Sequence, residues 1–411
     1  MPRTLSLEEL GKDELKGVPV MVRVDYNVPL SSSGQVSDTT RLEASLPTLR
    51  YLTRHGARMI LVSHLGRPDG QPDPKASLGP VAQVLEGLLE TSVPLVTDPL
   101  DSPELLQRVE GMEDGEVILL ENIRFHPGET ENDPELVRAL TRLCRVFVGD
   151  AFGAVHRAHA STEGVPRLLR EKGGRAVAGH LVQKELRFLR EALEDPDRPF
   201  VAVMGGAKIS GKIDLIESIL PRVDRLLIGG AMANTFFQAL GLEVGKSLVE
   251  PDRVEMAGTL LERAGDAILL PVDCVVADEV TSDAKTQIRD RTEIRPHDRI
   301  VDIGPRSRDV FAKEIAGGQT LLWNGPMGVF EMAPFSEGTM ALARAMAEAA
   351  DGGATVVVGG GDSAAAAQVA GVAARLTHIS TGGGASLDLL AGKPLPGVDA
   401  LESSDKSLEE V

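Results

Sequence analysis

The chain has 411 residues, of which 42% are hydrophobic and 25% charged, and its formal net charge is −18. This length exceeds one ordinary hydrophobic core and predicts two domains or three, while the negative charge disfavours nucleic acid and anionic membranes as partners. The sequence contains no apolar run long enough for a membrane span and begins with a polar stretch, which argues against a secretory signal.

Short β-rich runs alternate with amphipathic helical patterns along most of the chain. The predicted strands are 18–24, 58–62, 116–120, 146–149, 200–204, 225–228, 267–272, 320–323 and 354–358. The predicted helices between them include 80–90, 134–144, 212–220, 251–264 and 337–350. This alternation predicts parallel sheets covered by helices, and the near-continuous apolar strands indicate burial on both faces. The predicted fold is α/β, with two doubly wound, Rossmann-like parallel-sheet domains.

The region 176–199 separates the two halves of the chain. It holds a long helical pattern, AGHLVQKELRFLREALE, followed by the proline-rich stop DPDRP at 195–199. A helix that ends at such a stop predicts a semi-rigid connector and hinge between two sheets. We therefore expect an N-terminal domain over 1–175, a C-terminal domain over 200–390, and a last segment, 391–411, that returns to the N-terminal domain.

Polar clusters follow nearly every predicted strand. Parallel sheets bind ligands outside the carboxyl ends of their strands, so these clusters mark the expected site. The clusters of the first half contribute basic side chains, which are Arg23, Arg41, His64, Arg67, Arg124, His156, Arg157 and His159. Arginine forms bidentate hydrogen bonds with carboxylate and phosphate groups. The first half therefore suits a small, multiply charged anion.

Glycine dominates the clusters of the second half. These clusters are Gly205–Lys208, Gly229–Ala231, Asn324–Pro326 and Gly359–Ser363, and Lys212 follows the first of them. Glycines at helix starts allow backbone N–H groups to approach a phosphate closely, and the helix dipole adds to the attraction. The second half therefore suits a nucleotide.

Three glycine-rich stretches match known nucleotide motifs only in part. The stretch Gly206–Lys212 has the GxxxxGK spacing, but Ile213 replaces the Ser or Thr that would bind magnesium in a P-loop. The stretch Gly241–Ser247 is one residue too short for the same motif. The stretch Gly359–Ala364 resembles a dinucleotide fingerprint but lacks the acidic residue expected about 20 residues later. It leaves a nicotinamide-dependent dehydrogenase as the alternative enzyme.

The two cysteines, Cys144 and Cys274, lie far apart in apolar stretches. We interpret them as buried free thiols of a cytoplasmic protein in a reducing compartment, with no disulfide and no zinc site. No feature demands an oligomer, so a monomer is expected.

Eight segments, taken in order, resemble the phosphoglycerate kinase family. They are RVDYNVP (23–29), SHLGRP (63–68), LLENIRF (119–125), GDAFGAVHRAH (149–159), GGAKISGKI (205–213), WNGPMGVFE (323–331), GGGDS (359–363) and STGGGASL (380–387). The resemblance covers residues 17–401 without a large insertion. It implies a reversible step of glycolysis in which 1,3-bisphosphoglycerate and Mg·ADP give 3-phosphoglycerate and Mg·ATP.

The resemblance also implies a role for each matching residue. The implied substrate-binding residues are Asp25, Asn27, Arg41, His64, Leu65, Gly66, Arg67, Arg124 and Arg157. The implied nucleotide-binding residues are Gly206, Lys212, Gly229, Gly230, Pro326, Gly328, Glu331, Gly360, Gly361, Asp362 and Ser363. The implied catalytic residues are Arg41, Lys208, Gly360 and Gly382. Glu331 is expected at the ribose hydroxyls, and Asp362 at the Mg²⁺ ion that accompanies the nucleotide.

The chemistry of the expected site agrees with that family. A transferring phosphoryl group spreads negative charge over its oxygens, so catalysis rests on positioning and electrostatic stabilisation. No nucleophilic side chain or general base is needed, because the accepting oxygen is ionised at neutral pH. We expect the two domains to close on their substrates at the connector. The joint presence of Arg41, Lys208, Lys212 and Asp362 argues against a catalytically idle binding or scaffold protein.

A few residues of these motifs are better explained without a role in catalysis. We expect Arg23 to form a structural ion pair beneath the site and His159 to be structural. Met327 is interpreted as core or pocket wall. Ile300 replaces a glycine of some family members and is left out of the expected site.

Overall fold

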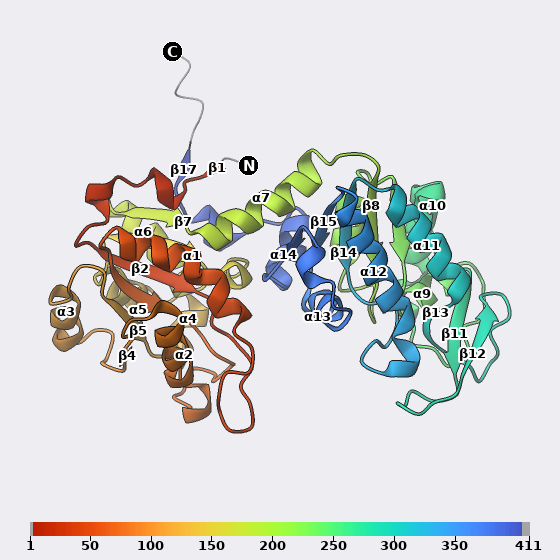
Figure 1. Cartoon of the computed structure of the whole chain (residues 1–411), viewed down its shortest axis with the longest axis horizontal. Coiled ribbons are helices and arrows are strands. Elements are labelled where there is room, and N and C mark those ends of the chain that lie inside the picture. The colour runs from red at the N-terminus through yellow and green to blue at the C-terminus, as the bar shows by residue number, and fades with distance from the viewer. Residues whose placement is uncertain (1–2, 405–411) are drawn as a thin grey trace, which may run out of the picture. The chain divides into compact units, whose positions relative to one another are not determined.

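The computed structural model describes residues 3–404, and the chain divides into two compact units (Figure 1). Unit 1 comprises the chain up to Leu186 together with the part from Pro394 onward, and unit 2 comprises Arg187–Lys393. Each unit contains a six-stranded sheet in which all strand pairs are parallel. The predicted fold of two doubly wound α/β domains is confirmed. Within residues 3–404, no helix is both long and apolar enough to cross a membrane.

The sheet of unit 1 has the strand order β4-β5-β3-β2-β6-β7. Its strands are β2 (Pro19–Val24), β3 (Arg58–Val62), β4 (Leu95–Val96), β5 (Val117–Leu120), β6 (Val146–Asp150) and β7 (Arg175–Ala178). The helices are α1 (Thr40–Arg54), α2 (Gly79–Leu89), α3 (Pro103–Glu110), α4 (Gly128–Glu131), α5 (Pro134–Thr141) and α6 (Val165–Glu171). Val20, Val22 and Val24 pack with α1 and α2, while Met21 is equally buried on the other face. This two-sided burial explains why the strands are apolar throughout.

The end of the chain completes unit 1. Strand β1 (Arg3–Thr4) pairs antiparallel with β17 (Ser403–Ser404), and α15 (Pro396–Asp399) precedes β17. The Arg170 guanidinium donates to the carbonyls of Ala400 and Leu401 at 3.0 and 3.1 Å. Hydrogen bonds from α6 and β1 therefore hold the residues near position 400 on unit 1.

The sheet of unit 2 has the strand order β10-β9-β8-β14-β15-β16. Its strands are β8 (Phe200–Met204), β9 (Arg225–Ile228), β10 (Ile268–Leu269), β14 (Thr320–Asn324), β15 (Thr355–Val358) and β16 (His378–Ile379). The helices are α8 (Ile213–Ile219), α9 (Met232–Ala239), α10 (Val254–Ala264), α11 (Pro305–Gly317), α12 (Glu337–Asp351), α13 (Gly361–Val369) and α14 (Gly384–Leu390). Trp323 lies fully buried in the core beneath α11 and α12. The carboxyl ends of β8 and β14 are adjacent, which brings their glycine-rich loops together.

A second sheet in unit 2 is antiparallel, and the sequence did not predict it. Its strands are β11 (Asp273–Ala277), β12 (Thr286–Asp290) and β13 (Arg299–Ile303), in the order β12-β11-β13. The single strand predicted over 267–272 is wrong in its extent. The structure has the short β10 there, then Pro271, and β11 begins only at Asp273. Strand β12 (TQIRD) is largely exposed, so it lacks the apolar run that marks the other strands.

Helix α7 (His180–Glu194) begins in unit 1 and ends in unit 2. Residues 176–178, assigned above to the connector, belong to β7 instead, because they continue the apolar edge of the sheet. The buried Asp150 carboxylate lies at the start of α7, where its Oδ1 atom accepts the Leu181 N–H at 2.9 Å. The Thr48 hydroxyl accepts the His180 N–H at 2.9 Å. Side chains of the N-terminal sheet and of α1 thus cap this helix.

Burial raises the pKa of Asp150 to about 7, although Thr48 and the N–H groups of α7 partly offset the effect. Since the ordinary pKa is 3.8, the unfolded chain releases this proton at lower pH than the folded chain. Wild-type stability, relative to an Asp150→Asn variant, should therefore be highest near pH 4 and fall until about pH 7, by at most about 1.4 kcal/mol per pH unit. Urea unfolding of both proteins from pH 4 to pH 8 measures the difference between their free energies of unfolding. A difference that does not change with pH would contradict the prediction.

Candidate functional site: two half-sites

The first half-site lies at the carboxyl ends of β2, β3 and β5. The Arg41 guanidinium, on the first turn of α1, bonds the Asp25 carboxylate at 2.8 Å. The Asn27 amide oxygen accepts the Gly66 N–H at 2.9 Å, and Arg124 donates to the Gly66 carbonyl at 2.7 Å. Hydrogen bonds thus connect Arg41 with Asp25, and Asn27 with Gly66 and Arg124, within one end of one sheet.

A cavity of about 570 Å³ opens beside this network. Arg67, Arg124 and Arg157 line it together with His126 and His159. Arg67 and Arg157 are exposed, and neither forms an ion pair among residues 3–404. Three guanidinium groups around one cavity provide the donors that a phosphate or carboxylate needs. The structure therefore brings together the arginines that the sequence predicted for the anion.

His64 is buried at the inner side of this half-site. Its Nδ1 atom lies 3.3 Å from Arg23 Nη2 and 3.9 Å from Asp25 Oδ1. Burial lowers the pKa of His64 well below 6.5, and Arg23, Arg124, Arg41 and Arg157 lower it further. The imidazole is consequently neutral at pH 7 and leaves the positive charge of the half-site to the arginines.

Arg23 lies beneath the half-site rather than in it, with only 2% of its surface exposed. Its Nε donates to Ser161 Oγ at 2.7 Å, and its Nη2 lies 4.0 Å from the buried Glu129 carboxylate. Ser161 in turn donates from its N–H and its hydroxyl to Glu129, at 2.9 and 2.6 Å. These contacts support the structural role expected for Arg23.

Asn122, which the sequence did not single out, is bonded to the backbone of Leu65. The Leu65 N–H and carbonyl are both bonded to the Asn122 side chain, at 3.2 and 2.7 Å, and Leu65 is buried. Leu65 therefore acts on the shape of the 63–68 loop. Asn122 fixes that loop, and it was missed because its partners lie more than fifty residues away along the chain.

The second half-site is a cavity of about 390 Å³ in unit 2. Six predicted nucleotide-binding residues line it, which are Gly206, Gly230, Pro326, Gly328, Glu331 and Asp362. Met327 lines it as well, in agreement with its interpretation as pocket wall. Ile300, which was left out of the expected site, also lines the cavity. It belongs to β13, in the sheet that the sequence did not predict.

Glycine is required where the loops around this cavity pack against one another. A Cβ atom on Gly205 would lie 2.0 Å from the Pro326 carbonyl oxygen. Gly230 has a φ angle of +64°, and a Cβ atom there would lie 2.5 Å from the Gly206 N atom. Gly229 makes room for Met327, since a Cβ atom on Gly229 would lie 2.3 Å from the Met327 Sδ atom. Its role in nucleotide binding stays a prediction.

Lys212 and the start of α13 form the polar end of the second half-site. The Lys212 ammonium donates to the carbonyls of Gly205 and Asn324 at 2.6 and 2.8 Å. Burial lowers its pKa to about 8, against the opposing effect of Asp362. Gly360 is the N-cap of α13 with a φ angle of +91°, and Gly361, Asp362 and Ser363 form the first turn. Free N–H groups of a first helical turn attract anions such as phosphates.

The structure does not bring Lys208 or Gly382 into the lining of either cavity. Lys208 is exposed and lies near Glu250. Burial opposes ionisation of that carboxyl, but hydrogen bonds from Ser210 and Ile209, and then the charge of Lys208, lower its pKa overall. Gly382 is buried, and its N–H donates to Ser380 Oγ at 3.1 Å. The catalytic roles of both residues stay predictions.

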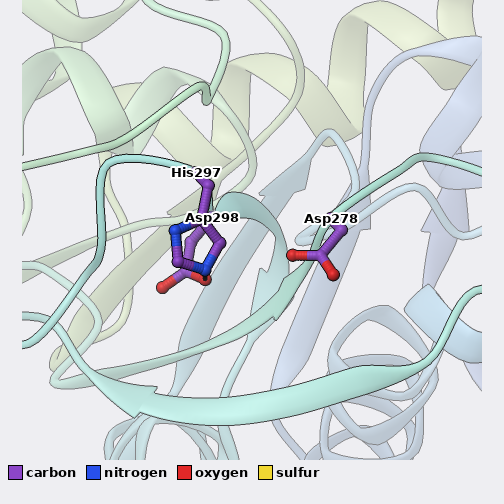
Figure 2. A group of neighbouring side chains, drawn as sticks. All are labelled: Asp278, His297 and Asp298. Atoms are coloured by element: carbon purple, nitrogen blue, oxygen red, sulfur yellow. Dashed lines mark ion pairs between the residues drawn. The ribbon is translucent and has the colours of Figure 1, made fainter.

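Two places in unit 2 offer carboxylates to a cation. The exposed Asp362 carboxylate lines the cavity at the start of α13. A second group, Asp278, His297 and Asp298, gathers near β13 (Figure 2). In that group Asp298 already accepts the Arg295 N–H at 2.9 Å and faces Arg289 Nε at 3.4 Å. Since magnesium is typically held by one or two carboxylates and substrate phosphates, Asp362 fits it better.

Comparisons with known proteins agree on one family. The family model described as phosphoglycerate kinase matches residues 10–393. A phosphoglycerate kinase of Chloroflexus aurantiacus is 52% identical over 393 residues, which make up 95% of this chain and 97% of that protein. A second, from Chlorobaculum tepidum, is 50% identical over 395 residues, 95% of this chain and 98% of that protein.

Solved structures give the same result. The phosphoglycerate kinase of Coxiella burnetii aligns with a TM-score of 0.86 and 41% identity, over 97% of this chain and 98% of that one. The enzyme from Pyrococcus horikoshii aligns with a TM-score of 0.81 and 32% identity, over 98% of each chain.

Proposed function

Because this chain belongs to the phosphoglycerate kinase family, we propose that it transfers a phosphoryl group reversibly between 1,3-bisphosphoglycerate and ADP, giving 3-phosphoglycerate and ATP. The observation that carries the proposal is the division of the polar residues into two half-sites. Arginines surround a cavity in unit 1, while a glycine-rich cavity with Lys212 and a helix N-terminus lies in unit 2. Each half-site has the chemistry of one substrate.

In unit 1 we assign the glycerate phosphate to the arginine cavity. Arg67, Arg124 and Arg157 hold the phosphate that is not transferred, and the neutral His64 lies buried beside Arg23 and Asp25. Asp25 and Asn27 hold the hydroxyl and carboxylate end of the glycerate. Arg41 already contacts Asp25, which directs its guanidinium toward that same end.

In unit 2 we assign the nucleotide to the glycine-rich cavity. Lys212 and the start of α13, from its N-cap Gly360 to Ser363, bind its phosphates, and the exposed Glu331 carboxylate accepts hydrogen bonds from the ribose hydroxyls. Asp362 would hold the Mg²⁺ ion, which supplies positive charge to the phosphate oxygens when bound.

The transfer itself needs no proton acceptor in the protein. The attacking oxygen belongs either to the 3-phosphoglycerate carboxylate or to the ADP β-phosphate, and both are ionised at neutral pH. Arg41 and Lys208 stabilise the charge that spreads over the oxygens of the moving phosphoryl group. Lys208 has to leave the neighbourhood of Glu250 for this role.

The reaction is tested by a coupled assay that starts from 3-phosphoglycerate and ATP. We expect magnesium-dependent turnover by the wild-type chain and a large loss in the Lys208→Ala variant. A wild-type chain that turns over neither substrate pair would refute the proposal. A preference for binding NADH over ADP would favour the dehydrogenase alternative instead.

The pKa of Lys212 predicts how nucleotide binding depends on pH. The protonated ammonium binds phosphate, and its pKa in the protein is about 8. ADP affinity should therefore be constant from pH 7 to about pH 8 and then fall by up to about tenfold per pH unit. Calorimetric titration of wild type and Lys212→Met separates this effect, because the variant should bind weakly with little dependence on pH. If the ADP affinity of both proteins depended on pH equally, Lys212 would not be the group responsible for that dependence.

Donor and acceptor must meet away from water, so we propose that the two units close around the bound substrates, with α7 as part of the hinge. Small-angle X-ray scattering should give a smaller radius of gyration with 3-phosphoglycerate and a non-hydrolysable ATP analogue together than with either alone. An unchanged radius with both ligands would contradict closure.

We further propose a monomeric, cytoplasmic enzyme. Cys144 and Cys274 are both free and buried, as expected in a reducing compartment. Burial raises the pKa of the Cys144 thiol to about 12, which keeps it protonated and unreactive.

A further inference from the structure

The loop between β8 and α8 carries Lys208, and its first residues line the nucleotide cavity. Gly206 and Ala207 belong to the lining of that cavity, but Lys208 does not. Lys208 and Ser210 are exposed, whereas Ile209 between them is fully buried. The lysine assigned to the moving phosphoryl group therefore follows the cavity lining in the chain without being part of it.

Glu250 binds the later part of this loop with both oxygens of its carboxylate. Its Oε1 atom accepts the Ser210 hydroxyl at 2.5 Å, and its Oε2 atom accepts the Ser210 N–H at 3.1 Å. The Ile209 N–H also bonds this carboxylate, which the positive charge of Lys208 attracts. Within residues 3–404, these are the hydrogen bonds that join residues 207–211 to a distant part of the chain.

The backbone around Glu250 gives its carboxylate a fixed place. The Glu250 N–H donates to the hydroxyl of Thr235 on α9 at 3.3 Å, and Thr235 is buried. Pro251 then begins the short helix that leads into α10. The loop itself has more freedom, because a glycine stands at each end and a Cβ atom on Gly211 would contact nothing within 4 Å. A loop with room to move is thus bonded to a fixed carboxylate.

The Glu250 carboxylate and a phosphoryl group compete for the same cation. Neither Glu250 nor Lys208 lines the nucleotide cavity, so Lys208 has to give up Glu250 to reach a phosphoryl group there. Lys208 is exposed and Glu250 only partly buried, and water screens contacts between such charges, which makes the exchange feasible. The transferring phosphoryl group spreads its negative charge over three oxygens and offers the ammonium a stronger partner.

We propose that Glu250 is a positioning residue, which holds Lys208 in a resting place beside the nucleotide cavity until the ammonium exchanges Glu250 for the transferring phosphoryl group. This inference rests on the proposed function and adds to it the event that brings Lys208 to the substrate. The contact with Glu250 exists before the transfer and is lost during it, so it stabilises the resting enzyme and raises the barrier. Removal of the carboxylate should favour complexes in which Lys208 holds the phosphoryl group.

The ligand-free chain provides the first test. Hydrogen–deuterium exchange of the Ile209 and Ser210 amides is measured in wild type, Glu250→Ala and Asp252→Ala. Asp252 is an exposed carboxylate, and no hydrogen bond or ion pair within residues 3–404 joins it to the loop. We expect exchange at least about tenfold faster in Glu250→Ala and at the wild-type rate in Asp252→Ala. Equal exchange in all three proteins would overturn the proposal.

The second test compares binding in the ground state and in the transition state. Aluminium fluoride, which takes the place of a transferring phosphoryl group, is titrated into each protein saturated with ADP, magnesium and 3-phosphoglycerate. We expect Glu250→Ala to bind it at least about threefold more tightly than wild type, with ADP affinity unchanged. In a Lys208→Ala background the same substitution should bring no gain, because no ammonium is left to release.

The results separate a resting contact from support of the fold. If Glu250 only supported the fold, its removal would weaken the binding of ADP and of aluminium fluoride together. Weaker or unchanged binding of aluminium fluoride by Glu250→Ala, or a gain that persists without Lys208, would overturn the proposal. A wild type that neither binds ADP nor turns over 3-phosphoglycerate and ATP would refute the proposed function instead, while the exchange rates still decide whether Glu250 restrains the loop.

Discussion

Replacing Arg41 by alanine should lower kcat by a hundredfold or more, with kcat/KM falling by a similar factor. Arg41 is held on the first turn of α1 and bonded to Asp25 at 2.8 Å, so its guanidinium is positioned before the substrates bind. A preorganised cation that acts chiefly on the charge of the transition state contributes about 3–4 kcal/mol to catalysis. A loss in kcat and kcat/KM together is the signature of such a contact.

Arg50→Ala provides the matched control for this experiment. Arg50 lies on the same helix, is exposed, and donates to the Leu88 carbonyl at 3.2 Å, remote from the half-site contacts. Its replacement should leave kcat unchanged. Steady-state kinetics of both variants test this role. If Arg41→Ala changed KM alone, Arg41 would contribute to binding of the substrate and not to stabilisation of the transition state.

Replacing Arg23 by methionine should lower the free energy of unfolding by about 3–5 kcal/mol, because it leaves the buried Glu129 carboxylate without a cation. Arg23 is 2% exposed, and burial lowers the pKa of its guanidinium despite the opposing effect of Glu129 and Asp25. The Ser161 hydroxyl also loses its donor partner. Methionine has a similar length and no charge, so the change isolates the polar contacts from the loss of volume.

Arg375→Met is the control for exposed ion pairs. Arg375 pairs with Asp351 at the surface, and such pairs contribute about 0–1 kcal/mol. Urea unfolding of both variants, and of Arg23→Met combined with Glu129→Gln, measures the difference and the coupling between the two residues. The second substitution should recover part of the lost stability. If Arg23→Met lowers the free energy of unfolding no more than Arg375→Met does, the buried network contributes no more stability than an exposed ion pair.

The sequence predicted the parallel sheets because their strands are apolar on both faces. The five-residue runs at 58–62 and 200–204 became β3 and β8 with the same bounds. Strand β12 was missed because its side chains are mostly exposed. Helix α1 was not among the predicted helices, and Pro47 within it disfavours a helix by local propensity. Its buried leucines pack against β2 and β3, and this tertiary packing outweighs the propensity.

The half-sites were predictable to the extent that they follow strand ends. Parallel topology brings the carboxyl ends of adjacent strands together, so Asp25, His64 and Arg124 met in unit 1 as their motifs indicated. Asn122 and Ile300 could not be found in this way. Asn122 acts through backbone groups distant in sequence, and Ile300 belongs to a sheet that no sequence pattern revealed.

The pairing of β1 with β17 has a consequence for the newly made chain. Unit 2 is one continuous stretch, so it can fold as soon as Lys393 has left the ribosome. Unit 1 has most of its residues much earlier but lacks the stretch that carries α15, Leu401 and β17. Until Leu401 has left the ribosome, the surface of Gly149 that it contacts stays uncovered. The domain synthesised first is therefore the last to be completed, and a nascent chain that stalls before Pro394 offers that apolar surface to chaperones or to aggregation.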